Sequence, residues 1–411
     1  MARDCVVGLD VGTTKICAIV AEIDSSGQIH IVGFGQSPSQ GIRKGVVVDI
    51  DSAAQAIVTC VNQARETSGY EINRVIVGVT GEHIASLNSR GVVAITHPNR
   101  EITESDVERV HDQSRVIVLP PDREIVHAIP RSYSVDGQSG VRFPVGMCGT
   151  RLEVETHVVT GAVTFLQNVV KCVQKAGLVI EATVLQPIAT AEAVLLPDER
   201  NLGVVVADIG GGTTDIAIFA EGDIVYSSAV AVGGSHVTRD ISIGLRTAAE
   251  EAERVKINHG AVILSDAGQE ELFSVTSLGS DSPSDLERRR LVEIIEPRMH
   301  ELFSLIKKEI LKSGHYNLLP AGVVLSGGGS LLLGAADLCH SVTGMPTRIG
   351  APNGVPGLPD QIKAPLHSTA VGLVLYGSRA HRRAEQIAKD GSLLGRLHRW
   401  LNRYAAHVIG H

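Results

Sequence analysis

One stretch of this chain combines carboxylates, glycines and hydroxyl groups at a spacing that suits phosphate chemistry. Its polar and glycine residues are, in order, Asp208, Gly210, Gly211, Gly212, Thr213, Thr214 and Asp215. Glycines allow backbone N–H groups to close on an anion, and threonine hydroxyls add further donors. Carboxylates can lie beside a phosphate when a hard cation such as Mg²⁺ stands between them. The pattern therefore predicts a phosphate site with a cation at Asp208.

A second stretch, near the start of the chain, has the same chemistry. Its members are Asp10, Gly12, Thr13, Thr14 and Lys15. The lysine adds a cation to the set. Two such stretches far apart in the chain predict two similar half-molecules that face one nucleotide, with Mg²⁺ held through water by Asp10 and Asp208.

The elements around both stretches are predicted to be strands. Apolar runs at 204–206 and 216–219 flank the central glycines, and runs at 6–9 and 16–20 flank Gly12. Each pair predicts a β-hairpin with a glycine-containing tip. In dinucleotide-binding and Walker-type loops, by contrast, the glycines open a helix. The alternative, an ordinary surface hairpin, would not need three glycines, two threonines and two aspartates together.

A third glycine cluster follows another strand-like run, at 323–325. It consists of Gly327, Gly328 and Gly329 and precedes a predicted helix over 331–338. Glycine allows a base or sugar to approach the backbone closely. Strand–glycine–helix turns are common in α/β proteins, so only the position of this cluster after the two hairpins indicates a nucleoside site.

The composition is that of a globular protein with more than one domain. The chain has 411 residues, 44% of them hydrophobic and 20% charged, with a net charge of −8. That length can hold two or more cores, and the negative balance argues against bulk nucleic-acid binding. The six cysteines include no Cys-x-x-Cys pair, which indicates reduced thiols. Asp10 interrupts the only apolar run near the start and no run approaches a membrane span, so we expect a cytosolic body.

The two hairpins and the later glycine cluster resemble the phosphate and adenosine motifs of the actin, heat-shock chaperone and sugar kinase superfamily. The resemblance extends to residues 185–192 and 368–373, which are similar to its two connecting helices. Within the superfamily, the order of motifs is most similar to the FtsA family of bacterial cell-division proteins, over nearly the whole chain. This implies an α/β, actin-like ATPase fold with two lobes around a nucleotide cleft, an inserted α/β subdomain and a C-terminal amphipathic helix.

The resemblance also implies a division into subdomains. Its parts are 1–82 with about 368–385 (subdomain 1A), 83–161 (the inserted 1C), 162–239 and 310–367 (first connecting helix and 2A), 240–309 (2B), and 386–411 (a linker and a membrane-targeting helix). The charged stretch 379–390 has the composition of a linker.

Ligands and individual roles follow from the same resemblance. It implies Mg²⁺ and ATP, with Glu253 and Lys256 contacting ribose and adenine, although residues so spaced on a helix most often form a surface ion pair. Gln186 stands where related ATPases keep a residue that positions the attacking water. A helix-start residue without a chemical role fits the sequence of Gln186 equally well.

The last segment of the chain departs from the globular pattern. An apolar stripe recurs along it at helical spacing and comprises Leu393, Leu394, Leu397, Trp400, Leu401 and Tyr404. Arg396, Arg399 and Arg403 accompany the stripe, and no acidic residue follows Asp390. A basic helix with Trp and Leu on one face is typical of a segment that lies in a membrane interface. The alternative is a terminal helix packed back onto the body.

The implied function is an ATP-binding cell-division protein that anchors filaments of the tubulin-like protein FtsZ to the cytoplasmic side of the inner membrane and helps assemble the septal ring. The Ile-Glu-Pro-Arg segment implies contacts of Glu296, Arg298 and Glu301 with the FtsZ C-terminal tail. The other implied partners are further copies of the chain in a filament, anionic lipids and later division proteins, with ATP hydrolysis slow at most.

Two alternative functions stay open. One is a small-molecule kinase of the superfamily, for which no extra Asp stands in a distinct sugar-binding context. The other is an actin-like pilus-assembly protein of the PilM type, which lacks the terminal helix.

Overall fold

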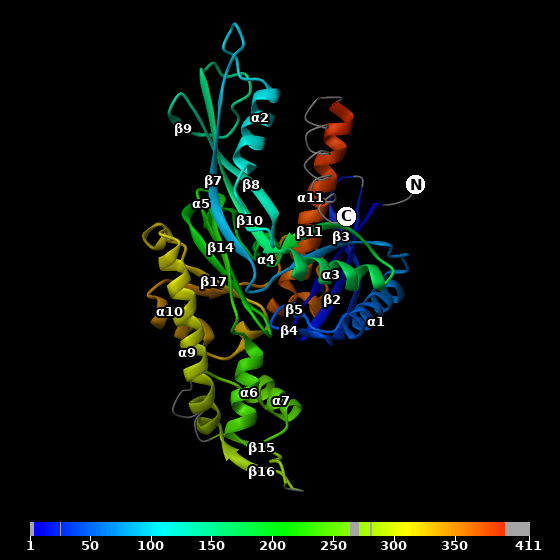
Figure 1. Ribbon diagram of the computed structural model, residues 1–411. Coiled ribbons are helices and arrows are strands. Elements are labelled where there is room, and N and C mark those ends of the chain that lie inside the picture. Colours follow the sequence, from blue (N-terminus) through cyan, green and yellow to red (C-terminus); the bar gives the residue numbers. More distant parts are fainter. Residues whose placement is uncertain (1–3, 25, 264–270, 280–281, 391–411) are drawn as a thin grey trace.

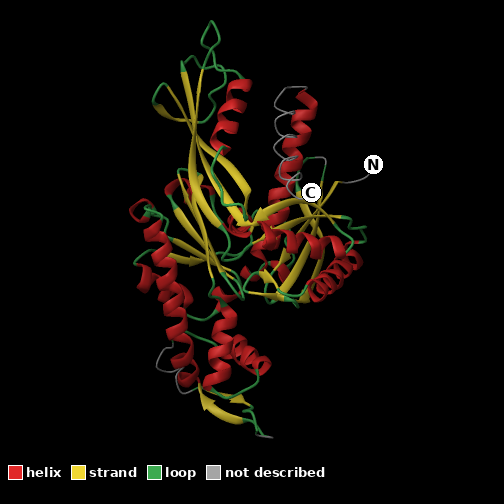
Figure 2. Ribbon diagram, in the orientation of Figure 1, coloured by secondary structure: helices red, strands yellow, loops and turns green. Residues whose placement is uncertain are grey.

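The computed structural model describes residues 4–24, 26–263, 271–279 and 282–390. Two lobes lie side by side, and a third unit projects from their junction (Figure 1). Each lobe has one central sheet with helices packed on it (Figure 2). The predicted α/β architecture of two lobes with an inserted subdomain is therefore confirmed, whereas the predicted C-terminal amphipathic helix lies outside the described residues.

The first lobe is built on a five-stranded mixed sheet. In spatial order its strands are β11 (Val179–Leu185), β6 (Arg74–Val79), β1 (Asp4–Val11), β2 (Lys15–Ile23) and β3 (Ile29–Pro38). The first three strands of the chain are antiparallel neighbours, and β6 and β11 add in parallel. Helices α1 (Ile50–Ser68) and α3 (Val163–Lys175) share one apolar core with this sheet, and the short hairpin β4 (Ile42–Arg43)–β5 (Val46–Val47) precedes α1.

The second lobe repeats this arrangement. In spatial order its strands are β14 (Asp223–Val230), β13 (Thr214–Ala220), β12 (Val204–Ile209), β17 (Val323–Ser326) and β18 (Thr347–Ile349). Three antiparallel strands are again followed by two parallel ones, so the prediction of two similar halves is confirmed. The helices of this lobe are α5 (Pro197–Leu202), α6 (Gly234–Gly244), α7 (Ala249–His259), α9 (Arg288–Lys312) and α10 (Ala335–Thr343). The small sheet β15 (Leu272–Val275)–β16 (Ser284–Glu287) lies at its far end (Figure 1).

Two helices connect the lobes, and two helix boundaries differ from expectation. The connecting helices are α4 (Gln186–Val194) and α11 (Ser368–Asp390). The prediction of a linker over 379–390 is wrong, because α11 continues to Asp390. The helix continues because Ala, Arg, Glu, Gln and Lys, which make up most of this stretch, are strong helix formers. The helix predicted over 331–338 begins only at Ala335, because Gly334 has a φ of 81°, which a continuing helix does not adopt. A 3₁₀ turn at Gly328–Leu331 precedes it.

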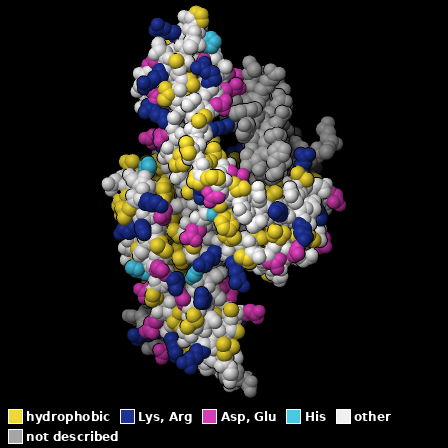
Figure 3. Space-filling view, in the orientation of Figure 1, with side chains coloured by type: hydrophobic (Ala, Val, Ile, Leu, Met, Phe, Trp, Pro, Cys, Tyr) yellow, Lys and Arg dark blue, Asp and Glu magenta, His cyan; other side chains and the backbone are white. Residues whose placement is uncertain are grey.

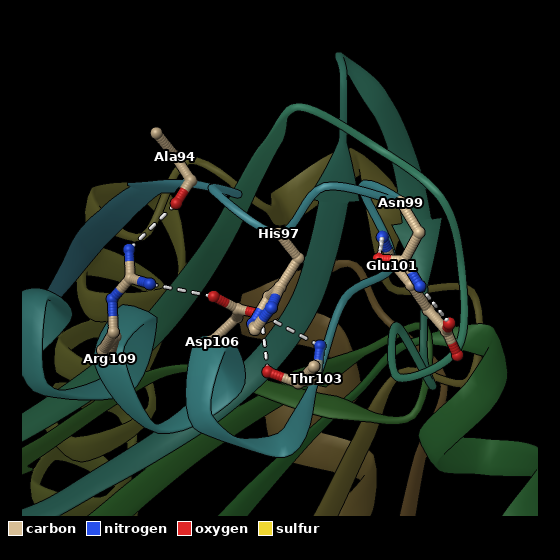
Figure 4. Close-up of polar contacts among 7 residues, drawn as sticks. All are labelled: Ala94, His97, Asn99, Glu101, Thr103, Asp106 and Arg109. Atoms are coloured by element: carbon tan, nitrogen blue, oxygen red, sulfur yellow. Dashed lines mark hydrogen bonds and ion pairs between the residues drawn. The ribbon is translucent and has the colours of Figure 1, made fainter.

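The inserted unit is a four-stranded sheet with one helix. Its strands, in spatial order, are β7 (Ala85–Ala94), β10 (Arg151–Ala162), β8 (Arg123–Val135) and β9 (Gln138–Val141), and its helix is α2 (Glu104–Arg115). Figure 4 shows how polar contacts fix the start of α2. Thr103 donates through its N–H and its hydroxyl to the buried carboxylate of Asp106, at 3.0 and 2.7 Å. Arg109 bonds Asp106 and the Ala94 carbonyl, both at 2.9 Å, and so ties α2 to the end of β7.

The insert is bonded to both lobes at its base. Ser86 donates to the carbonyl of Ser227 on the edge strand β14 at 2.6 Å, and Asn88 donates to the carbonyl of Val225 at 3.2 Å. The buried His157 completes this contact, with ring nitrogens 2.8 Å from Asn88 Oδ1 and 3.0 Å from Ser227 Oγ. On the other side, His127 accepts the N–H of Leu185 at 2.9 Å, directly before α4. The insert therefore covers the edge of the second sheet and supports the start of a connecting helix.

These two histidines predict a loss of stability in acid. Burial lowers the pKa of His127 to about 4 and that of His157 to about 3, in His157 helped by the charge of Arg131. Because these values lie below the unfolded value near 6.5, the unfolded chain binds more protons, so the stability is present above that pH and is lost as the pH falls. Taken alone, these two histidines should lower the free energy of unfolding by roughly 5 kcal/mol from pH 7 to pH 4.5, a contribution measured as the difference between wild type and the histidine variants.

Urea unfolding at several pH values measures this dependence. His157→Gln should flatten it, whereas His300→Gln, at an exposed position of α9, should leave it unchanged. A slope that is the same in wild type and His157→Gln would show that His157 does not contribute to it.

Candidate functional site

The tips of the two predicted hairpins meet across the lobes. A Cβ placed on Gly212 would lie 2.7 Å from Thr13 Oγ1 and 2.8 Å from Lys44 Cα, and one on Gly211 would overlap the side chain of Thr14. Gly45, at the tip of the β4–β5 hairpin, donates its N–H to Thr13 Oγ1 at 2.9 Å. The glycines at these positions allow two backbones to approach so closely. The structure thus brings the two predicted phosphate motifs into direct contact.

Three carboxylates are buried behind these tips. Asp10 is the last residue but one of β1, while Asp208 and Asp215 face each other in the register of β12 and β13. Burial raises the pKa of Asp10 to about 6 and that of Asp215 to about 7, and the charge of Asp208 adds to both shifts. Burial also raises the pKa of Asp208. Buried like charges of this kind are stabilised by a cation, and carboxylate oxygens are of the ligand type that Mg²⁺ prefers.

Lys15 provides a second test of the fit to a nucleotide. Its Nζ is buried and has no hydrogen-bond partner among the described residues. Its charge lowers the pKa of both Asp10 and Asp208, in each case against the larger effect of burial. A buried ammonium without an acceptor is unfavourable, because its lost hydration is not replaced. A phosphate would supply the missing acceptor, and the site fits one.

Gln186 lies at this site. It is the first residue of α4, its side chain is buried, and its Nε2 donates to Asp10 Oδ1 at 2.9 Å. Gln186, the residue predicted to position water, is therefore in contact with Asp10, a candidate ligand of the cation. Its role in positioning water stays a prediction.

The sequence reasoning did not single out three threonines of the site. Thr80, the residue directly after β6, donates to Asp215 and so joins the lobes. Thr190 of α4 and Thr369 of α11 donate to Asp208 Oδ2 at 2.5 and 2.8 Å. Asp215 belongs to the motif, and its place in the strand pairing could have indicated that it faces Asp208. No local pattern could have revealed the threonines, because they lie 18 and 161 residues from Asp208.

Glu253 and Lys256 form the expected ion pair, and it borders the site. Lys256 Nζ lies 2.7 Å from Glu253 Oε2 and also donates to Thr238 Oγ1 at 2.8 Å and to the Gly234 carbonyl at 3.2 Å. Gly234 in turn donates its N–H to the carbonyl of Gly210 at 2.9 Å. The Lys256 side chain is only 13% exposed, which distinguishes this pair from an ordinary surface pair. Contact with ribose or adenine stays a prediction.

The third glycine cluster packs on the strand that carries Asp208. A Cβ on Gly327 would overlap Asp208 Oδ1, and one on Gly329 would overlap Ile209. Gly328 has more room, since the nearest atom to its Cβ would be Leu366 Cβ at 3.9 Å. The first and third glycines are thus required for packing, and only Gly328 presents an open backbone.

The predicted partner-binding residues lie on a different part of the molecule. Glu296, Arg298 and Glu301 are on α9, where Arg298 donates to Asp240 of α6 at 2.6 and 3.2 Å and pairs with Glu301. Among the described residues, the hydrogen bonds of Arg298 go to Asp240 and Glu301 and none reaches either hairpin. The membrane set (Leu393, Leu394, Leu397, Trp400, Leu401) lies outside the described residues.

Two kinds of feature are absent from the described part of the chain. No group of three His, Cys, Asp or Glu side chains there could by itself hold a metal ion. No helix there has the length and apolarity that crossing a membrane requires.

Comparison with protein families gives two matches. Residues 205–372 match the model of the cell division protein FtsA, and residues 81–160 match the SHS2 domain inserted in FtsA. The chain is 43% identical over 406 residues to the cell division protein FtsA of Pseudomonas aeruginosa, covering 96% of this chain and 97% of that protein. It is 36% identical over 414 residues to that of Escherichia coli, covering 98% of both.

Solved structures of other proteins also share this fold. The PilM–PilN type IV pilus biogenesis complex matches with a TM-score of 0.64 at 19% identity, covering 92% of this chain and 99% of that chain. MreB5 of Spiroplasma citri bound to ADP matches with a TM-score of 0.54 at 15% identity, covering 94% and 99%. At these identities the likeness shows the fold alone, which is actin-like.

Proposed function

The chain belongs to the FtsA family of cell division proteins, and on that premise we propose that it binds Mg-ATP between its lobes and anchors FtsZ filaments to the cytoplasmic side of the inner membrane at the septum. The observation that carries the nucleotide part is the unpartnered ammonium of Lys15 beside two facing hairpins. We adopt the division into subdomains 1A, 1C, 2A and 2B with the boundaries given above. Self-association into filaments and recruitment of later division proteins belong to the same proposal.

Each residue of the site has a task in this proposal. The backbone N–H groups and threonines of the two hairpins bind the phosphates, Lys15 neutralises them, and Asp10 and Asp208 hold Mg²⁺ through water. When bound, Mg²⁺ supplies positive charge that offsets charge developing on the phosphate oxygens. Gln186 orients a water from its place beside Asp10. Because Gln186 Nε2 already donates to Asp10, it is less available to orient a water, and we expect any ATP hydrolysis to be slow.

The FtsZ tail is proposed to dock on α9 around Glu296, Arg298 and Glu301. Side chains of both charges lie among hydrophobic ones at this end of the molecule (Figure 3), which suits a peptide that carries both charged and apolar residues. Arg298 is 28% exposed and lies between two carboxylates, Asp240 and Glu301. Arg298→Glu would put three carboxylates together and should weaken the binding of an FtsZ tail peptide at least tenfold, as measured by fluorescence anisotropy.

Arg289→Glu is the matched control for this experiment. It reverses the charge of another arginine on the same helix, one that is also paired, with Glu293 at 3.2 Å. An equal loss of peptide affinity in both variants would mean a general charge effect, and no loss in either would move the docking site elsewhere.

The membrane anchor is proposed to be the terminal stripe, on the strength of its sequence. Burying Leu393, Leu397 and Leu401 should contribute roughly 1.5–3 kcal/mol per side chain before ordering costs. Each arginine adds about 1 kcal/mol near an anionic leaflet. These values predict reversible attachment of one molecule, which a filament would strengthen by avidity.

Trp400→Glu places a charge within the stripe and tests the anchor. We expect flotation with anionic liposomes to fall at least tenfold and ATP affinity to stay unchanged, whereas Trp400→Phe should retain most of the binding. A Trp400→Glu protein that floats as well as wild type would show that the tail is not the anchor.

A further inference from the structure

Asp208 is held by both connecting helices at once. Its Oδ2 accepts the hydroxyl of Thr190 from α4 at 2.5 Å and the hydroxyl of Thr369 from α11 at 2.8 Å. The two hydroxyl oxygens are themselves 3.0 Å apart. All three side chains are at least nine-tenths buried. We call this group of Asp208, Thr190 and Thr369 the hydroxyl latch.

The latch leaves one carboxylate oxygen free of hydroxyls. A carboxylate oxygen has about two acceptor positions, and the two threonines use both of those on Oδ2. No described residue donates a hydrogen bond to Oδ1, which lies against Gly327. The threonines therefore fix which oxygen of Asp208 can serve a cation or its bound water.

The same face of α4 also contacts the carboxylate of the other lobe. Gln186 and Thr190 are one helical turn apart, so their side chains lie on one face. Gln186 donates to Asp10 of the first lobe, and Thr190 donates to Asp208 of the second. One turn of α4 thus bridges the two carboxylates proposed to hold Mg²⁺.

The crossing of the two helices sets the position of the second threonine. A Cβ on Gly372 of α11 would overlap the Ala189 carbonyl of α4, so the helices are in backbone contact one residue before Thr190. The start of α11 also lies against the first lobe, because a Cβ on Gly8 of β1 would be 2.8 Å from the Ala370 carbonyl. A change in the angle between the lobes must therefore move at least one latch hydroxyl relative to Asp208.

We propose that Thr190 and Thr369 are positioning residues that couple the cation at the nucleotide site to the angle between the lobes. They orient Asp208 so that Oδ1 serves the cation, and they do so only at the helix crossing seen here. By linkage, binding of the cation with its nucleotide favours that same crossing, because coupling between two equilibria is reciprocal. This inference rests on the proposed Mg-ATP site.

The test removes the hydroxyls and keeps the shape of the side chains. Thr190→Val and Thr369→Val are made singly and together, with Thr190→Ser and Thr369→Ser to restore the hydroxyls. Thr59→Val is the control, since the Thr59 hydroxyl bonds only the Gln55 carbonyl in its own helix, at 3.0 Å. ATP affinity is measured by calorimetry in Mg²⁺ and in EDTA. We expect the ratio of the two affinities to fall about tenfold in the double valine variant, with the EDTA value unchanged and the serine variants like wild type.

A second measurement reports the angle between the lobes without relying on ATP binding. Spin labels at Gln55→Cys on α1 and Ser304→Cys on α9, in a Cys148→Ser background that removes the exposed native thiol, give the distance between the lobes. The valine variants should broaden or shift this distance in the absence of nucleotide and should lose its response to Mg-ATP. The proposal is overturned if the double valine variant keeps both the wild-type distance distribution and the wild-type Mg²⁺ ratio. A wild type that binds no ATP would instead refute the proposed function, and the nucleotide-free distances would still decide whether the latch sets the angle.

Discussion

Gly212→Val is expected to lower ATP affinity at least 100-fold while the protein stays folded. The added Cβ would lie 2.7 Å from Thr13 Oγ1, 2.8 Å from Lys44 Cα and 3.0 Å from Lys44 N, so it must push the facing hairpins of the two lobes apart. Contacts shorter than 3 Å to backbone atoms cannot be relieved by rotating a side chain. The phosphate donors of both motifs would then no longer converge, and several charge-assisted hydrogen bonds would be lost together.

Calorimetric titration with Mg-ATP measures this loss, with thermal unfolding as the check on folding. The matched control is Gly137→Asn in the turn between β8 and β9, where a Cβ meets nothing within 4 Å and where, at a φ of 89°, Asn is among the side chains that adopt positive φ most often. Asp208→Ala should act differently, weakening binding mainly when Mg²⁺ is present. Wild-type affinity in both Gly212→Val and Asp208→Ala would refute the nucleotide site.

The parts of the site that could be predicted are those written in a short stretch of sequence. Each hairpin shows two apolar runs, a glycine tip and clustered Asp and Thr side chains, within residues 204–219 or 6–20, so both its strands and its chemistry can be predicted from that stretch. The helical path of α11 from 379 to 390 was less evident. Its charged residues suggested a linker, although the same residues are strong helix formers and continue a helix that is already nucleated.

The contacts between distant segments could not be predicted in this way. Thr369 meets Asp208 only because α11 returns to the cleft and crosses α4 there. His157 is buried because the edge strand of the second lobe covers it, and its sequence neighbours do not show this. Tertiary packing determines such contacts, and no local pattern in a single sequence indicates them.

Gly372→Ala is expected to lower the free energy of unfolding by about 3 kcal/mol, the upper part of the usual range for overpacking. Glycine inside a helix costs about 1 kcal/mol relative to alanine, so helix propensity alone predicts that this substitution stabilises α11. The expected sign is the opposite, because the new Cβ would overlap the carbonyl of Ala189, a backbone atom that cannot move unless α4 and α11 separate. Denaturant unfolding gives the change in free energy directly.

Gly377→Ala on the same helix is the control that separates two causes of lost stability, the backbone clash at the helix crossing and ordinary overpacking of the core. Its Cβ would meet the side-chain ends of Ile76 and Val6, which can rotate or shift, whereas the Cβ at Gly372 meets backbone. Both substitutions gain the same helix propensity, so the difference between their unfolding free energies isolates the cost of moving α4. If Gly372→Ala is no less stable than Gly377→Ala, the two connecting helices have room to part, and their contact does not fix the geometry around Asp208. If Gly372→Ala is less stable than Gly377→Ala by the expected amount, the crossing of α4 and α11 is rigid. The residues at the crossing must then move together when the lobes move.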